Sequence, residues 1–163
     1  MFLKKDYRNM LKEFKRYWKN YVFQSLLAMV VIFFLLLFID FLGVLVVASI
    51  GASTFIIFAM PENITAQPYN IIGGHLVGII WGGVCSQIPH SGAIECAVVY
   101  ALAVGLSIFT MVIIDTEHPP ATGTSLAVVV QGFSLSIAVS VMIPIIGLSL
   151  IHVIFRKQIR NLV

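Results

Sequence analysis

The middle of this sequence lacks basic side chains. No Lys or Arg occurs between Asn20 and Phe155, only 10% of the 163 residues are charged, and 60% are hydrophobic. Soluble domains carry roughly 25% charged residues, which cover their water-facing surface. A chain with a mean hydropathy of +1.02 has too few of them for that purpose. The composition therefore excludes an ordinary soluble protein and predicts an integral membrane protein whose main partner is the lipid bilayer.

Motifs of covalent, metal and phosphate chemistry are also missing. The two cysteines, Cys85 and Cys96, form no CxxC pair, and no Cys or His cluster has metal-ligand spacing. The sequence contains no GxSxG elbow, no HExxH helix and no phosphate loop. We therefore expect no enzyme activity, no metal site and no cofactor.

All ten basic residues lie at the two ends of the chain. Short flanks rich in Lys and Arg stay on the cytoplasmic side of a membrane. This predicts that both termini are cytoplasmic and that the number of crossings is even. The brevity of the chain and the lack of a transit peptide favour a bacterial plasma (inner) membrane. The pI near 9.0 reflects these flanks, so no nucleic-acid partner is expected. The basic residues are Lys4, Lys5, Arg8, Lys12, Lys15, Arg16, Lys19, Arg156, Lys157 and Arg160.

The start of the chain has the periodicity of an amphipathic helix, with basic residues on one face and apolar residues on the other. Such a helix lies in the membrane interface with its cations near anionic headgroups. We therefore divide the chain into an interfacial helix at residues 1–20, a transmembrane domain at 21–155 and a basic cytoplasmic tail at 156–163. The apolar stripe consists of Leu3, Tyr7, Met10, Leu11, Phe14 and Trp18.

Five apolar segments are long enough to cross a membrane, which takes about 20 residues. They are residues 21–39, 42–60, 71–88, 96–114 and 134–155, with a tight turn expected at Asp40 and Gly43. A sixth segment, 118–133, reaches only about 20 Å as a helix from residue 120, so it either crosses with an extended stretch before it or re-enters the membrane. We expect an all-α polytopic bundle of about six membrane segments, some of them broken or re-entrant.

Small residues recur at a spacing of four on two of these segments, where they allow close helix contact in lipid. Both stripes are expected to pack within the chain, although a dimer contact would suit them equally. The stripes are Gly74, Gly78 and Gly82, and Ala97, Ala101 and Gly105.

Two polar connectors containing proline, residues 60–70 and 115–125, interrupt the apolar pattern in a similar way. Irregular backbone at membrane depth is tolerated only inside protein or beside a water-filled cavity. Proline suits the first turn of a new helix, whose free N–H groups and dipole attract anions. We therefore predict a solute site at these helix starts, and short discontinuous helices favour a transporter. The candidates are His118, Pro119, Pro120, Thr122, Gly123, Thr124 and Ser125, with Pro68, Asn70, Gly73, Gly74 and His75 in the second site.

Ionisable residues inside a membrane are costly and usually functional. His75, His118, Asp115 and Glu117 are the ones at risk of burial, although the acids may equally be solvated loop residues. A histidine can donate a hydrogen bond, balance an anion or carry a proton. His90 and His152 are expected in the outer loop and at the interface.

Three motifs resemble those of the HPP family of integral membrane proteins. They are Gly51-Ala52-Ser53 with Met60-Pro61, the run AQPYNIIGGH at residues 66–75, and the run HPPATGTS at residues 118–125. The resemblance covers roughly residues 20–155 and adds Ser53 to the candidate site. Some members of the family carry nitrite, so the resemblance implies a transporter or channel for a small inorganic anion such as nitrite.

Two other functions stay open. Asp115 and Glu117 would suit a cation or neutral-solute pathway, and His75 and His118 would suit the ligands of a membrane redox or haem protein. A single chain of this length is small for a pore, which leaves a homo-oligomer open.

Overall fold

A computed structural model describes residues 7–37 and 44–162, and all regular elements in these two stretches are helical. The first six residues of the expected interfacial helix and the expected turn at Asp40 and Gly43 lie outside the described residues. The elements are α1 (Tyr7–Leu37), α2 (Val44–Ala59), the short 3-10 helix η1 (Ile64–Ala66), α3 (Pro68–Cys85), α4 (Ala93–Ile113), α5 (Pro120–Gln131) and α6 (Leu135–Phe155).

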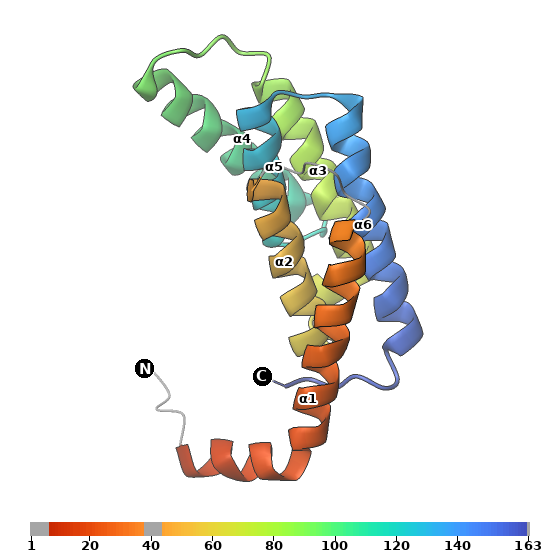
Figure 1. The fold of residues 1–163 in the computed structure, drawn as a ribbon. Coiled ribbons are helices and arrows are strands. Elements are labelled where there is room, and N and C mark those ends of the chain that lie inside the picture. The colour runs from red at the N-terminus through yellow and green to blue at the C-terminus, as the bar shows by residue number, and fades with distance from the viewer. Residues whose placement is uncertain (1–6, 38–43, 163) are drawn as a thin grey trace.

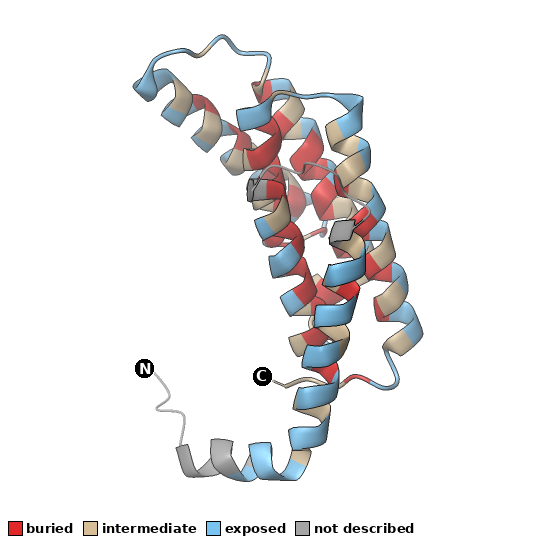
Figure 2. Cartoon of the chain, viewed as in Figure 1, coloured by how far each residue is buried: buried red, intermediate tan, exposed pale blue. Residues whose placement is uncertain are grey.

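The helices form one bundle in which α3 and α5 are central, with α2, α4 and α6 packed around them (Figure 1). Buried residues gather on the inner faces of α2, α3, α5 and α6, whereas α1 and α4 are largely exposed (Figure 2). Many large apolar side chains are exposed on the outside of the bundle. The predicted all-α polytopic membrane bundle is confirmed.

The N-terminal helix is bent where the interfacial stretch meets the first span. Tyr17 has non-helical dihedral angles (φ −122°, ψ 16°), and the helix before it runs across the direction of the rest of α1 (Figure 1). The stretch Phe14–Leu35, which includes this bend, qualifies as a membrane span by length and hydropathy. The exposed side chains of Lys12, Lys15, Arg16 and Lys19 lie around this bend. The predicted interfacial helix and the first span are therefore two helical stretches that meet at a kink at Tyr17.

Only part of the bundle has the length of an independent span. Three described helical stretches, in α1, α4 and α6, are long and apolar enough to cross a membrane alone. The α2 helix has 16 residues and α5 has 12, so at 1.5 Å per residue α5 is only about 18 Å long. Because α5 is short and lies between α3 and α4, its polar start lies inside the protein rather than at its end.

The glycine stripe on α3 explains the tight contact with α5. A Cβ atom added at Gly78 would stand 2.5 Å from the Ala121 carbonyl oxygen, and one at Gly82 would stand 2.6 Å from that of Ser125. The packing predicted for this stripe is correct. The prediction was wrong for the stripe on α4, where Ala97, Ala101 and Gly105 are exposed and nothing lies within 4 Å of a Cβ at Gly105.

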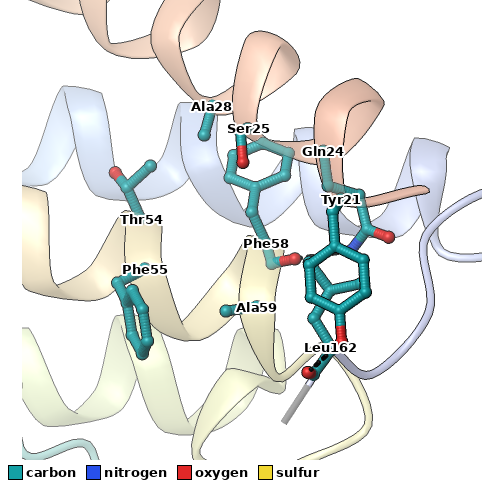
Figure 3. Close-up of a pocket in the computed structure, with 9 residues that line it drawn as sticks. All are labelled: Tyr21, Gln24, Ser25, Ala28, Thr54, Phe55, Phe58, Ala59 and Leu162. Carbon is teal, nitrogen blue, oxygen red and sulfur yellow. Dashed lines mark hydrogen bonds between the residues drawn. The ribbon is translucent and has the colours of Figure 1, made fainter. Parts of the chain in front are cut away.

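The C-terminal tail is fastened to the start of the bundle. The Gln24 side chain donates hydrogen bonds to the carbonyl oxygens of Phe58 and Arg160. The Tyr21 hydroxyl donates to that of Leu162 (Figure 3). The Leu162 N–H donates to the Ala59 carbonyl oxygen over 2.9 Å. These bonds place the tail, the start of the first span and the end of α2 at one end of the bundle, as an even number of crossings requires. Which side of the membrane this end faces stays a prediction.

Candidate functional site

The connector between α4 and α5 is held by an amide side chain from α3. Asp115 adopts a left-handed conformation (φ 53°), which ends α4, and the Thr116 N–H then donates to the Met111 carbonyl oxygen. The Asn70 side chain lies 3.4 Å from the carbonyl oxygens of both Asp115 and Glu117 and donates to them. Asn70 therefore fixes the connector rather than offering its amide to a solute.

The two glycines predicted to expose backbone at the start of α3 are covered by this connector. A Cβ at Gly73 would stand 2.7 Å from Thr116 Cγ2, and a Cβ at Gly74 would stand 2.8 Å from His118 Cβ. Their small size lets the connector approach α3. The α3 helix begins at Pro68, three residues before the predicted span at 71–88, and binding of an anion at this second site stays a prediction.

The start of α5 also differs from the prediction of free amides. Pro119 and Pro120 have no N–H, the Ala121 N–H donates to the His118 carbonyl oxygen over 2.8 Å, and the Thr122 N–H donates to that of Pro119 over 3.2 Å. The first available donors are therefore used in a local turn. Gly123 faces α2, where a Cβ would stand 3.4 Å from that of Ser49.

The polar side chains of both interrupted segments meet in one continuous chain of hydrogen bonds. His118 Nδ1 lies 2.7 Å from the Thr65 carbonyl oxygen of η1. The other His118 nitrogen, Nε2, lies 2.8 Å from Ser53 Oγ on α2, and His75 Nε2 lies 3.0 Å from the same oxygen. The Ser53 hydroxyl therefore bridges two imidazoles that come from different segments.

The chain continues from His75 to the first turn of α5. His75 Nδ1 lies 2.8 Å from Thr124 Oγ1, which lies 2.9 Å from Ser49 Oγ, and the Ser49 hydroxyl donates to the Pro120 carbonyl oxygen over 2.6 Å. All five side chains are at most 4% exposed. We call them the polar chain: His118, Ser53, His75, Thr124 and Ser49.

The remaining predicted residues lie around the polar chain. The buried Ser125 hydroxyl donates to the Ala103 carbonyl oxygen of α4 over 3.0 Å and so belongs to the packing of α5 on α4. Thr122 donates to the Pro119 carbonyl oxygen. The side chain of Asp115 is exposed, as expected of a solvated loop acid.

A cavity of about 370 Å³ lies beside the His118 end of the polar chain. It is bounded on one side by the end of α4 and on the other by the connector and the first turn of α5. Its lining residues are Ile108, Met111, Val112, Glu117, His118, Pro119 and Thr122. Glu117, His118, Pro119 and Thr122 are thus the predicted residues that border an accessible space.

The geometry does not fit one haem held by both predicted histidines. A haem needs its flat macrocycle between two axial ligands, but both Nε2 atoms point at the Ser53 hydroxyl, which lies within 3.0 Å of each. Both Nδ1 atoms are hydrogen-bonded as well. No space for a macrocycle separates the two rings.

Sequence reasoning missed one member of the polar chain, Ser49, and the Thr65 carbonyl that bonds to one end of it. Ser49 lies in an apolar run, and the Thr65 carbonyl carries no side-chain signal. The spacing of Ser49 and Ser53 by four residues, which puts both on one helix face, is the signal that would have found Ser49.

Comparison with known families agrees with this arrangement. The HPP transmembrane region matches residues 14–163 of the chain. The chain belongs to the HPP family. The match includes both interrupted segments and extends to the fastened C-terminal tail, beyond the range in which the motifs were recognised. As an HPP protein it is an integral membrane protein with several membrane segments.

Curated relatives of this HPP chain carry only general names. A transmembrane protein of Dictyostelium discoideum is 31% identical over 121 residues, which make up 71% of this chain and 41% of that protein. A second transmembrane protein of the same organism is 32% identical over 88 residues, or 54% of this chain and 28% of that protein. The chain thus spans less than half the length of these relatives. No solved structure matches it.

Proposed function

We propose that this protein is a membrane transporter or channel for a small inorganic anion such as nitrite. The observation that carries the proposal is the polar chain, which joins both interrupted segments inside an apolar bundle. Buried polar groups within a membrane are costly and usually mark a solute or proton path. Discontinuous helices in corresponding positions are typical of transporter sites. The family resemblance drawn from the HPP motifs supports the same class of solute.

The cavity beside His118 is the proposed place of solute entry. The amides of Ala121 and Thr122 are engaged, so an anion there would have to draw a donor from the Thr122 hydroxyl or the His118 imidazole, which already bond to other groups of the protein. These bind more weakly than Lys or Arg, which suits a site that must release as well as bind. A bacterial inner membrane, cytoplasmic termini and a homo-oligomer remain parts of this proposal.

Glu117 favours a second candidate, a pathway for a cation or a neutral solute. Glu117 lines the same cavity as His118 and Thr122. A carboxylate attracts cations and repels anions, and the effect is stronger in a cavity that focuses the field. Glu117→Gln separates the two candidates, because it should raise the uptake of an anion and lower that of a cation.

The test is uptake of a panel of small anions and cations into proteoliposomes at two pH values. Nitrite uptake is expected to fall by about tenfold or more in His118→Ala, the loss expected when an interaction of about 1.4 kcal/mol is removed. Gly123→Leu should also reduce uptake, because the new side chain meets α2 at Ser49. Matched controls are His90→Ala in the outer loop and Gly105→Leu on the open face of α4.

Nitrite uptake that survives both His118→Ala and Gly123→Leu would contradict the assigned site. Absence of flux for every ion tested, with the protein folded in the membrane, would contradict transport itself.

A further inference from the structure

The polar chain has carbonyl oxygens at both ends, which restricts its hydrogens. A carbonyl oxygen only accepts, so the Thr65 oxygen requires a hydrogen on His118 Nδ1. At the other end, the Pro120 oxygen takes the hydrogen of the Ser49 hydroxyl. At both ends, therefore, the donated hydrogen points outward, away from the centre of the polar chain.

The position of the hydrogen on Ser49 fixes the positions of those on Thr124 and His75. Because Ser49 has donated its only hydrogen, the link between Ser49 and Thr124 needs the Thr124 hydrogen. Thr124 then has none left for His75, so the 2.8 Å link between them needs a hydrogen on His75 Nδ1. A neutral imidazole carries one N–H and one bare nitrogen. Both His75 and His118, when neutral, are thus left with bare Nε2 atoms.

Both bare nitrogens face Ser53, whose hydroxyl has a single hydrogen. His118 Nε2 lies 2.8 Å and His75 Nε2 lies 3.0 Å from Ser53 Oγ. The Ser49 carbonyl oxygen, 3.0 Å from Ser53 Oγ, is a third acceptor for the same hydrogen. In the neutral chain at least one acceptor at Ser53 stays without a donor.

We propose that His75, Ser53 and His118 form a buried site that binds one proton shared between the two imidazoles. A proton from water binds to the lone pair of one Nε2 atom, which becomes an N–H donor to Ser53 Oγ. The Ser53 hydroxyl then rotates so that it donates its hydrogen to the other Nε2 atom. Each of the six hydrogen bonds between the Thr65 and Pro120 carbonyl oxygens then contains one hydrogen. Moving the added proton to the other ring takes two coupled transfers, in which the N–H hydrogen passes to Ser53 Oγ while the Ser53 hydrogen passes to the other Nε2 atom, so that each bond broken is matched by one formed.

The spacing selects a proton over a metal cation. Both nitrogens stand at hydrogen-bond distance from Ser53 Oγ, so no other ion fits between them without moving that side chain. The described residues also contain no group of three or more His, Cys, Asp or Glu side chains able to hold a metal.

The surroundings leave this site without a fixed partner charge among the described residues. His75 and His118 face each other with ring centroids 5.1 Å apart. Glu117 is the carboxyl residue that shares a cavity with His118. Asp115 and Glu62 are exposed in the two connectors, and His152 is buried on α6. The hydrogen bonds of the polar chain do not include the side chain of any of these four.

The proton site is tested by 15N NMR of the histidines in the full chain, reconstituted in lipid and titrated with acid. Signals of His75 and His118 are assigned by their loss in His75→Gln and His118→Gln. In the unaltered protein both signals are expected to change together, in one step that adds one proton to the pair. At high pH both rings are expected as Nδ1–H tautomers.

Ser53→Ala removes the hydroxyl that both Nε2 atoms contact. Four hydrogen bonds of the polar chain then remain, and the neutral side chains supply one hydrogen for each. We expect both rings to keep the Nδ1–H tautomer and to lose the shared step. Ser53→Thr, which retains a hydroxyl, should restore it, and Ser107→Ala, which removes a buried serine bonded to its own helix, should not affect it. Two rings that stay neutral at every pH at which the protein is folded would overturn the proposal, as would a shared step that persists in Ser53→Ala. Because the titration needs no flux, its result is independent of whether nitrite is transported.

Discussion

The rings of His75 and His118 lie 5.1 Å apart with a tilt of 51°, and Gly74 makes this approach possible. His118 Cβ occupies the space that a side chain at Gly74 would take, 2.8 Å from its Cβ position. The glycine stripe of α3 thus does more than pack helices. It brings the connector before α5 close enough for the second histidine to reach the hydroxyl that the first one already contacts.

Replacement of Gly78 by alanine is expected to lower stability more than the same change at Gly105. A Cβ at Gly78 would stand 2.5 Å from the Ala121 carbonyl oxygen, a backbone atom that moves only if α5 moves. Overpacking of this kind typically costs about 1–3 kcal/mol. Gly105→Ala adds a methyl group to an open face and should be neutral or stabilising. The measurement is thermal unfolding in detergent followed by circular dichroism, and equal losses in both variants would argue against the close α3–α5 contact.

Much of the fold follows from the sequence because the relevant signals are local. Apolar length located the helices, although only three of the five segments predicted to be long enough to cross are so in the described residues, and the helix starts at Pro68 and Pro120 lie in the proline-containing connectors. The confinement of basic residues to the ends predicted an even number of crossings, with which the placement of both ends of the described chain agrees. These signals depend on neighbouring residues, so they can be read without knowing which helices touch.

Most side chains of the polar chain were named from the sequence, but their contacts were not. Sequence reasoning named His75, His118 and Thr124, yet it assigned the binding role to free amides that the structure uses in a turn. Whether an amide is free depends on backbone dihedral angles, here the helical conformation of Pro119 (φ −50°, ψ −39°). The bridge at Ser53 depends on three segments meeting, which no local pattern specifies.

The fastening of the C-terminal tail is expected to depend on Gln24. Its side chain donates to Phe58 and Arg160 and accepts from the Arg160 N–H, and it is only 1% exposed. Gln24→Leu removes all three bonds, and hydrogen bonds in membrane bundles contribute about 0.6 kcal/mol each on average. We expect trypsin to cut faster after Arg156, Lys157 and Arg160, measured by mass spectrometry of the intact chain.

The matched control for this change is Gln131→Leu at the end of α5, where the amide bonds only to its own helix. It should leave the rate of tryptic cleavage of the tail unchanged. Equal acceleration in both variants would indicate a general loss of stability rather than release of the tail.

The replacement of His152 by leucine is expected to stabilise the protein. Sequence reasoning placed His152 at the membrane interface, but its side chain is 1% exposed on the inner face of α6. Neither ring nitrogen has a hydrogen-bond partner among the described residues, and the Ser149 hydroxyl one turn earlier also lacks one.

A buried polar group left without a partner costs about 1–3 kcal/mol, whereas leucine offers only apolar atoms of similar bulk. His152→Leu should therefore raise the unfolding temperature relative to His90→Leu, a change in the loop between α3 and α4. A lower unfolding temperature would mean that His152 is bonded in the membrane to a water molecule or a solute, and a parallel assay of nitrite uptake would then distinguish a structural water from a solute on its pathway.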